Sequence, residues 1–331
     1  MLASVLRNNK FIIENIERPV FNGTGAIIKV IGCGLCGSDI VKYTHNLVKN
    51  GAVLGHEVVG EIVDVEKNSK FKISDIVAVA HHYPCLECNY CKHGNYSMCR
   101  TFKESNIIPG GFSEYIKVDS NHLKYTVHKV NEGMDIITAS FMEPLSCCYR
   151  AVRRMNLLKD DRVLIVGLGS IGILMGQACK TFGTKVIGLD VKQERLENAK
   201  NYGFDEVYLA QEQKESLKVD SVFLTAGADS SIKSALDNIR DGGKICVFAS
   251  TKSETPAFPN NEIYYRELNV YGSYSPSPDD IKISFDLLKN KIVKVDGLTT
   301  VYDINNLNEA IADTQSGKIL KAFIKVGDSD V

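Results

Sequence analysis

Hydrophobic and polar residues alternate in short segments along the first third of the chain. The segments are separated by Gly, Asn, Asp and Pro, and they cover Ala26–Ile31, Val58–Val65, Ile76–Val79 and Glu114–Val118. Alternation with a period of two is typical of strands that bury one face, and the intervening residues favour turns. The pattern therefore predicts a β-barrel or β-sandwich in this part of the chain.

The pattern changes near residue 145, where apolar strands begin to alternate with amphipathic helices. The expected strands are Val163–Val166, Lys185–Leu189, Val222–Leu224 and Lys244–Phe248, and the expected helices are Ile171–Thr181, Glu194–Tyr202 and Ser230–Ile239. This alternation predicts an α/β domain with a parallel sheet covered by helices on both faces. After about residue 280, a further helix, Ile281–Leu288, leads to a final strand, Lys321–Val326.

Length and composition limit the class of protein. The chain has 331 residues, of which 44% are hydrophobic and 24% charged, and its formal net charge is −1. This length favours two domains, and the mixed charges argue against a nucleic-acid partner. No apolar run reaches the ~20 residues of a membrane helix, and the early charges argue against a secretory signal. We expect a soluble, cytoplasmic protein with no membrane partner.

Three glycines lie where a buried strand runs directly into a helix, in the segment Val163-Leu-Ile-Val-Gly-Leu-Gly-Ser-Ile-Gly172. Gly167 permits a tight turn, Gly169 lets the backbone approach a pyrophosphate, and Gly172 allows close packing of helix against strand. The N–H groups at the start of the helix favour phosphate binding. Such a trio can also form a flexible turn, but its place between strand and helix favours a dinucleotide site.

An acidic residue, Asp190, ends the next strand, about 20 residues after the glycines. A carboxylate there accepts hydrogen bonds from the ribose hydroxyls and repels a 2′-phosphate, which favours NAD over NADP. Asp190 could alternatively cap the following helix, and Lys192 and Arg195 are nearby cations. The candidate cofactor-binding residues are Gly167, Gly169, Ser170, Ile171, Gly172, Asp190, Arg195 and Thr225.

Four of the ten cysteines fall within fifteen residues, at Cys85, Cys88, Cys91 and Cys99. A dense cysteine cluster in a reducing compartment is more often a metal site than a set of disulfides. Four thiolates supply the closed tetrahedron of a structural zinc site. The alternative is a loop of unpaired or disulfide-bonded cysteines. His93 lies inside this segment and is expected to be a solvated loop residue.

A second set of candidate metal ligands is spread more widely, at Cys36, His56, Glu57 and Glu143. A sulfur, an imidazole and a carboxylate gathered in one place suit a zinc ion that keeps one coordination position open. Each residue also has an ordinary structural interpretation. Cys36 could belong to the core, His56 could be a hydrogen-bonded histidine, and Glu143 could be a surface acid before a proline or the start of a helix.

The order of these motifs resembles that of the zinc-containing medium-chain alcohol dehydrogenases. The motifs are Cys36-Gly-Ser-Asp, Gly55-His-Glu, the four-cysteine segment, Gly110-Gly-Phe-Ser-Glu-Tyr115 and the glycine trio, and Glu143-Pro-Leu resembles the sorbitol and polyol dehydrogenase branch. The resemblance implies a GroES-like domain over residues 1–145, completed by 280–331. It also implies a Rossmann NAD-binding domain over 146–279 and a homodimer or homotetramer formed through that domain.

The resemblance further implies a reaction and residue roles. The reaction is hydride transfer between NAD(H) and a secondary alcohol or polyol and its ketone, with two zinc ions per chain. Cys36, His56 and Glu143 would surround the catalytic zinc, with Glu57 as an outer or alternate ligand. Ser38 would take the proton from the substrate oxygen, although it could instead cap a helix. Cys33 occupies a position that is not a ligand in this family.

Several positions depart from the family pattern and leave the substrate open. Val41 stands where many relatives carry a relay histidine, for which His45 or water could substitute. Ser275 stands where polyol dehydrogenases often carry arginine, and Arg150 stands where histidine is common. A sugar phosphate, an amino alcohol such as threonine, or a simple secondary alcohol therefore remain alternative substrates. Lysines that could serve a phosphate are Lys42, Lys49 and Lys103, and a further alternative is a catalytically silent nucleotide-binding relative.

Overall fold

The structure is a computed structural model that describes residues 1–45, 47–250 and 258–327. The chain forms two compact units: unit 1 comprises Met1–Ser146 and Pro276–Val331, and unit 2 comprises Cys147–Ser275. Helix α6 (Met142–Arg154) carries the chain out of unit 1. Residues 328–331, which end the C-terminal return expected for the first domain, lie outside the described residues.

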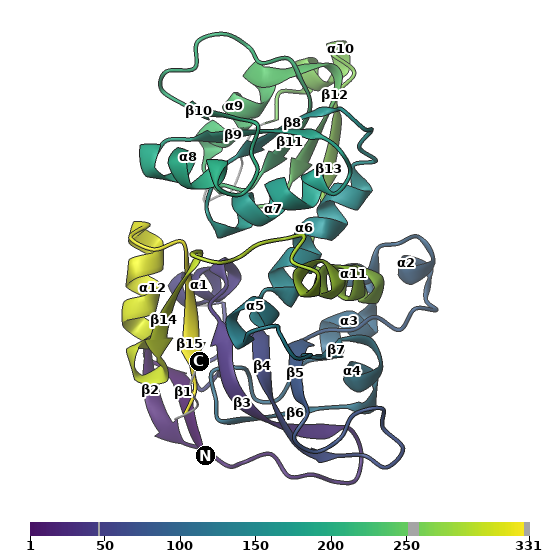
Figure 1. Ribbon diagram of the computed structural model, residues 1–331, viewed down its shortest axis with the longest axis vertical. Helices are drawn as coiled ribbons and strands as arrows, with labels where there is room; N and C mark the ends of the chain where they lie inside the picture. The colour runs from purple at the N-terminus through teal and green to yellow at the C-terminus, as the bar shows by residue number, and fades with distance from the viewer. Residues whose placement is uncertain (46, 251–257, 328–331) are drawn as a thin grey trace. The chain divides into compact units, whose positions relative to one another are not determined.

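Unit 1 is built on a largely antiparallel sheet and a hairpin of β1 and β2 (Figure 1). The sheet order is β14-β15-β3-β4-β5-β7, and β6 pairs with β3. The strands are β1 Leu2–Arg7, β2 Lys10–Asn15, β3 Ala26–Gly34, β4 Glu57–Val65, β5 Ile76–Ala80, β6 Tyr115–Val118, β7 Val127–Lys129, β14 Thr299–Asp303 and β15 Lys321–Lys325. The β structure predicted for the first third of the chain is confirmed.

The C-terminal strand β15 joins unit 1 by pairing antiparallel with β3, and Phe323 lies opposite Gly34. The neighbouring Gly32 makes this close approach possible, because a Cβ atom there would collide with the ring of Phe323. The buried side chains of Ala322 and Ile324 add the C-terminal strand to the core of the unit. The last strand therefore lies beside the end of β3, directly before Cys36.

The helices of unit 1 are mostly short and surround the sheet. They are α1 Gly37–Thr44, α2 Asn89–Lys92, α3 Arg100–Glu104, α4 Ser120–Tyr125, α5 Ile136–Ser140, α11 Pro278–Lys289 and α12 Leu307–Ser316, with the 3-10 turns η1 Tyr96–Met98 and η2 Ile304–Asn306. The hydrophobic pattern predicted only α11 among them. Helices α1 to α5 have four to eight residues and are too short to display a 3.6-residue period, whereas α12, with ten residues, was missed. None of the helices in the described residues has the length and apolarity of a membrane span.

Unit 2 contains a six-stranded parallel sheet in the order β10-β9-β8-β11-β12-β13. Its strands are β8 Arg162–Val166, β9 Lys185–Asp190, β10 Glu206–Leu209, β11 Val219–Leu224, β12 Ile239–Val247 and β13 Asn269–Gly272, and its helices are α7 Ser170–Lys180, α8 Gln193–Lys200, α9 Asp229–Asn238 and α10 Asn260–Tyr265. This order reverses between β8 and β11, as in the doubly wound dinucleotide-binding fold. The predicted parallel α/β sheet is confirmed.

Candidate functional site

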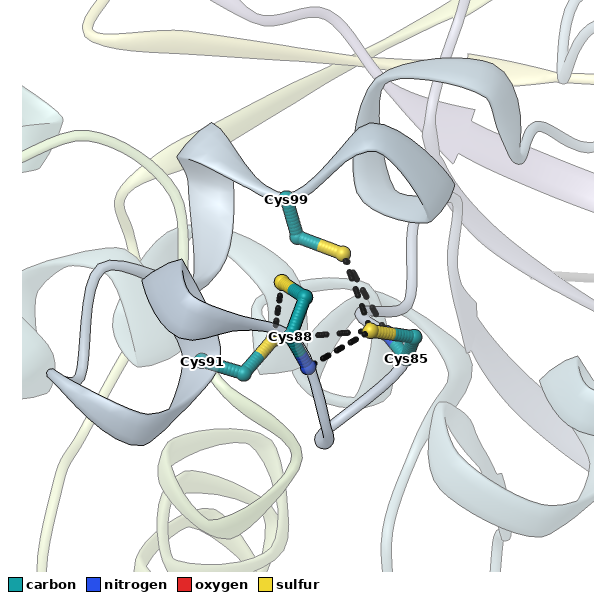
Figure 2. A group of neighbouring side chains, drawn as sticks. All are labelled: Cys85, Cys88, Cys91 and Cys99. Carbon is teal, nitrogen blue, oxygen red and sulfur yellow. Dashed lines mark hydrogen bonds between the residues drawn. The ribbon is translucent and has the colours of Figure 1, made fainter.

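The four clustered cysteines of unit 1 turn their sulfur atoms toward one another (Figure 2). The Sγ atoms of Cys85 and Cys91 lie 4.0 Å apart, those of Cys88 and Cys91 3.6 Å, and those of Cys85 and Cys99 3.5 Å. Zinc–sulfur bonds of about 2.3 Å in a tetrahedron place sulfurs about 3.8 Å apart. The two sulfurs of a disulfide lie about 2 Å apart, and all four cysteines are free. The geometry fits a closed four-thiolate metal site.

The protein around these sulfurs also stabilises negative charge. The backbone N–H groups of Cys85 and Cys88 donate to the sulfurs of Cys99 and Cys85, each at 3.4 Å. Although burial raises the pKa of Cys99, hydrogen bonds from the backbone of Cys85 and Phe102 bring it down to about 6. Burial and the Cys88 thiol raise the pKa of Cys91 to about 12, so Cys99 ionises more easily than Cys91. His93 is exposed, as expected.

A second candidate metal centre brings together Cys36, His56 and Glu57, whose ligand atoms lie within 4.8 Å of one another. Cys36 follows β3 and is the N-cap of α1, while His56 and Glu57 stand at the start of β4. Because β3 and β4 pair antiparallel, with Gly34 opposite Glu57, residues distant in the sequence meet at one end of the sheet. One sulfur, one imidazole and one carboxylate are a donor set that suits zinc.

Asp39 orients the imidazole of this centre. Its Oδ1 lies 3.3 Å from His56 Nδ1, and both side chains are buried. Burial alone lowers the pKa of His56, but the Asp39 carboxylate and the Cys36 sulfur raise it well above its usual value. The surrounding negative charge therefore favours a cation at this position, whether a proton or a metal ion. A carboxylate behind a histidine ligand is also the usual way to fix its orientation.

Glu57 is paired with a lysine from the far end of the chain. Lys321 Nζ lies 2.5 Å from Glu57 Oε2 and 3.3 Å from the carbonyl oxygen of Leu35, and both side chains of the ion pair are buried. Burial alone lowers the pKa of Lys321, but Glu57 and Cys36 raise it above its usual value. The two charges meet as a close ion pair through Oε2, and Glu57 Oε1 has no hydrogen-bond partner among the described residues.

The positions of Glu143 and Ser38 exclude one ordinary structural interpretation for each: a surface acid for Glu143 and a helix cap for Ser38. Glu143 lies in the first turn of α6 and is only 5% exposed, so the interpretation as a surface acid is wrong. It contributes to the raised pKa of Lys321 and therefore lies near the second centre. Ser38 does not cap α1, because the N-cap is Cys36, whose sulfur accepts from the Ser38 N–H at 3.5 Å. The Ser38 side chain is exposed.

In unit 2, each glycine of the trio plays a different part in the geometry of the loop that leads into α7. Gly167 has φ +98, and a Cβ atom on Gly172 would collide with the Gly167 carbonyl oxygen. Gly169 is the N-cap of α7 and has open space around its Cβ position, with no side chain capping the helix. Ser170 and Ile171 follow as the first residues of that helix. The loop therefore leaves room and unshared N–H groups for a pyrophosphate.

Thr225 and Asp190 hold this loop from the ends of two other strands. Thr225 Oγ1 donates to the Gly167 carbonyl oxygen at 2.6 Å, across the point where the strand order reverses. Asp190 Oδ2 accepts from Leu168 N at 2.6 Å and lies 3.5 Å from Arg195 Nη1. The N-cap of α8 is Lys192, not Asp190. These residues gather at the carboxyl ends of the strands, where such folds bind dinucleotides.

The family of this chain follows from comparison with known proteins. A family model described as the alcohol dehydrogenase GroES-like domain matches residues 23–132, and one described as zinc-binding dehydrogenase matches residues 170–290. Sorbitol dehydrogenase of Halalkalibacterium halodurans is 32% identical over 330 residues, which cover 95% of each chain. This chain belongs to the zinc-dependent alcohol dehydrogenase family. The predicted resemblance and the oxidoreductase class are confirmed.

Two further similarities extend this picture of a zinc-dependent alcohol dehydrogenase. D-xylulose reductase A of Aspergillus oryzae is 27% identical over 350 residues, covering 96% of each chain. The crystal structure of L-idonate 5-dehydrogenase from Escherichia coli has a TM-score of 0.85 and 24% identity, and the match covers 98% of this chain and 96% of that one. The predicted combination of a GroES-like and a Rossmann domain is thereby confirmed.

Three side chains of this alcohol dehydrogenase's metal region were not predicted from sequence as part of it. In the sequence, Asp39 belongs to a motif and Lys321 begins a predicted strand, but neither pattern indicates a role at a metal site. The ring of His81 packs against that of His56 with centroids 4.5 Å apart and the ring planes tilted by 43°, and His81 Nδ1 is buried without a hydrogen-bond partner in the described part of the chain. The signal available for Asp39 was its place three residues after the candidate ligand Cys36, about one helical turn along. No local signal marks the other two.

Proposed function

We propose that this chain is an NAD-linked, zinc-dependent dehydrogenase that interconverts a secondary alcohol or polyol and its ketone. The observation that carries the proposal is the group of Cys36, His56 and Glu57, which gathers a zinc donor set in unit 1 while unit 2 carries a dinucleotide loop. The sorbitol dehydrogenase and D-xylulose reductase relatives favour a polyol as substrate. Zinc supplies Lewis acidity toward the substrate oxygen, and NAD supplies the hydride acceptor.

We propose that Cys36, His56 and Glu143 hold the catalytic zinc and that Glu57 is an outer or alternate ligand. The charge balance supports this division. The buried ammonium of Lys321 offsets the charge of Glu57, which leaves Cys36 and Glu143 as anionic ligands for a divalent ion, with the Asp39 carboxylate behind His56 as a further negative charge. Asp39 keeps the ring of His56 in a fixed orientation through its Nδ1. Cys85, Cys88, Cys91 and Cys99 hold the structural zinc.

We propose that the Ser38 hydroxyl receives the substrate proton and passes it to solvent. The exposure of Ser38 supports direct transfer to water. Val41 is 38% exposed, and its aliphatic side chain can neither accept nor donate a proton. His45 is the exposed C-cap at the other end of α1, so we assign it no relay role. In the oxidation direction the alcohol loses a hydride to NAD⁺ and a proton through Ser38, which balances the reaction.

We propose that the cofactor is NAD, held by Gly167, Gly169, Ser170, Ile171, Gly172, Asp190, Arg195 and Thr225. The support is the buried carboxylate of Asp190 at the end of β9, which disfavours a 2′-phosphate. Arg195 lies 3.5 Å from that carboxylate and pairs with it. Its positive charge is therefore already engaged and attracts a 2′-phosphate less than a solvated arginine does.

We further propose a cytoplasmic homodimer or homotetramer assembled through unit 2. The sheet of that unit ends in β13, a strand with one unpaired edge among the described residues. The nearby side chains of Tyr264, Tyr265 and Val270 are 75%, 78% and 39% exposed, which is unfavourable for apolar groups in water. All ten cysteines are free, as suits a reducing compartment.

A substrate panel tests the proposed function. Polyols, sugar phosphates, threonine and short secondary alcohols are each assayed with NAD and with NADP by the absorbance of the reduced nicotinamide. We expect the highest kcat/KM with a polyol and NAD. A higher kcat/KM for a sugar phosphate or threonine would move the enzyme to another branch of the family. Turnover of none of these alcohols by zinc-loaded protein would contradict the proposal.

A further inference from the structure

The metal centre of unit 1 contains one more potential ligand than an open zinc site uses. Under the proposed function the ligands are Cys36, His56 and Glu143. Glu57 lies close by, because its carboxylate and the ligand atoms of Cys36 and His56 are within 4.8 Å of one another. A zinc site with three protein ligands keeps a position for substrate, whereas four protein ligands close it. The position of the Glu57 carboxylate therefore decides whether this site is open.

Hydrogen bonds do not hold Glu57 away from the other ligands. Its carboxylate fills the space beside Gly34, where a Cβ atom would collide with Glu57 Oε2. The side chain is buried, and its Oε1 has no hydrogen-bond partner among the described residues. A buried carboxylate oxygen without a donor is costly and gains free energy by binding a cation. A different contact must therefore restrain Glu57.

Lys321 supplies that restraint. Its Nζ lies 2.5 Å from Glu57 Oε2 and donates to the Leu35 carbonyl oxygen at 3.3 Å. The ammonium also lies over the ring of Phe141, 5.7 Å from the ring centroid. Both charged side chains are buried, so water competes little with their pairing. Lys321 thus holds the Glu57 carboxylate beside the segment that leads into Cys36.

This ion pair makes metal binding unfavourable for Glu57 for two reasons. The carboxylate already has a cation beside it, so a second cation stabilises it less. If the carboxylate moved away, Lys321 would remain a buried ammonium with the Leu35 carbonyl oxygen as its hydrogen-bond acceptor in the described ranges. A buried charge that loses its partner is strongly destabilising. Glu57 therefore stays with Lys321 as long as the ammonium is present.

We propose that Lys321 is a positioning residue that holds Glu57 out of the metal's coordination and so keeps the fourth position open for substrate. This inference rests on the proposed function, which assigns Cys36, His56 and Glu143 as the ligands. Without the ammonium, Glu57 binds the metal as a fourth protein ligand. The centre then becomes a closed site of the kind that four protein ligands form, and substrate is excluded from it.

The test compares Lys321→Met with Lys318→Met as a matched control. Methionine keeps most of the volume of lysine and removes its charge. Lys318 lies three residues earlier and also pairs with a carboxylate, that of Asp313 at 2.8 Å, but its side chain is 66% exposed. The control therefore removes a lysine–carboxylate pair from the same region without touching the metal centre.

Two further variants isolate the role of the carboxylate and protect the test against misfolding. The double variant Lys321→Met/Glu57→Gln removes the carboxylate that would close the site. Lys321→Gln removes the charge but keeps a donor for Glu57 and for the Leu35 carbonyl oxygen, so it is less demanding on folding. If Lys321→Met does not fold, the same criteria apply to Lys321→Gln.

Three quantities are measured on the full chain. Imidazole binding to the cobalt(II)-substituted catalytic centre is followed by visible absorption, metal release is followed with a chelator, and kcat/KM is measured on the zinc enzyme. For Lys321→Met we expect at least ~10-fold weaker imidazole binding, at least ~10-fold slower metal release and at least ~10-fold lower kcat/KM. Lys318→Met should match wild type in all three. The double variant should bind imidazole as wild type does, and Lys321→Gln should fall between wild type and Lys321→Met.

Several results would overturn the proposal. Unchanged imidazole binding in Lys321→Met would show that Glu57 does not close the site when the ammonium is absent. Weak imidazole binding that persists in the double variant would show that another group, not Glu57, blocks the position. An equal loss in Lys318→Met would indicate a general effect on unit 1. A wild type that binds no metal at Cys36 contradicts the proposed function, whereas unchanged imidazole binding in Lys321→Met beside an active wild type refutes this inference alone.

Discussion

Replacing Lys321 by methionine should destabilise unit 1 strongly, because it leaves the buried Glu57 carboxylate without its partner. The two side chains are 5% and 1% exposed, and their charged atoms lie 2.5 Å apart. Methionine keeps most of the volume of lysine, so the change removes the charge while disturbing packing little. The Leu35 carbonyl oxygen, 3.3 Å from Lys321 Nζ, loses a donor in the same substitution.

The size of the effect follows from burial. Removing one partner of a buried ion pair typically costs about 3–5 kcal/mol, because the remaining charge is uncompensated. Unit 1 contains about 200 residues, for which 1 kcal/mol corresponds to about 2–4 °C in Tm. We therefore expect the Tm of unit 1 to fall by about 6–20 °C. The loss should be smaller in zinc-loaded than in chelator-treated protein, since a nearby metal ion also offsets the charge of Glu57.

Urea denaturation of wild type, Lys321→Met, Glu57→Gln and the double variant measures this directly. The double variant should recover much of the loss, with a coupling energy of about 2 kcal/mol or more between the two sites. Lys318→Met is the control, because Lys318 pairs with Asp313 at 2.8 Å but is largely exposed, so its pair adds little stability. If Lys321→Met lost less than about 1 kcal/mol, or no more than the control, the reasoning about buried charge would be wrong.

Four further predictions concern the metal sites, the cofactor and pH. Cys36→Ser should remove about one zinc per chain and nearly all turnover, whereas Cys88→Ser should mainly lower stability; metal analysis finding fewer than two zinc ions in wild type would contradict this. Glu143→Gln should lower kcat/KM at least ~10-fold with a nearly unchanged Tm, and full activity with normal zinc content would remove the residue from the site. Wild type should favour NAD over NADP by at least ~10-fold in kcat/KM, about 1.4 kcal/mol, and Asp190→Ser should narrow that ratio; a wild-type preference for NADP would refute the role of this carboxylate. Burial lowers the pKa of His128 to about 4, below the unfolded value near 6.5, so the stability it contributes is complete above pH 6.5 and is lost as the pH falls toward 4. The Tm of His128→Gln should therefore fall less than that of wild type between pH 7 and pH 4, and parallel curves would show that His128 does not titrate as described.

Sequence patterns identified most of the long, regular elements and missed most of the short ones for a physical reason. Strands such as β3 and β8 alternate or run apolar over enough residues to be distinguished, because one or both faces are buried. The β1–β2 hairpin was not predicted, although Asn8 and Asn9 carried a signal: both adopt positive φ in the turn, a conformation that asparagine tolerates. The short helices of the cysteine segment are formed around its sulfurs and carry no period of their own.

Spacing along the chain was sufficient wherever a site is made by neighbours in sequence. The sulfurs of Cys85 and Cys99 come from one segment of fifteen residues, so their clustering follows from local geometry. The glycine loop likewise needs only a strand, a turn and a helix start, which Gly167 and Gly172 already encode. In both cases the chain segment between the functional atoms is too short to allow many arrangements.

Tertiary structure alone decided the contacts between distant segments. Lys321 reaches Leu35, 286 positions away, because β15 pairs with β3, and only that pairing places its ammonium beside Glu57. Arg150 reaches the Ser275 carbonyl oxygen, 125 positions away, because the chain leaving β13 returns past α6. The sequence does not distinguish a buried lysine or arginine from a solvated one. The free energy of burying its charge depends on which partners the fold supplies. Sequence read alone could name these residues, but their roles arise from desolvation and pairing, which exist only after the chain has folded.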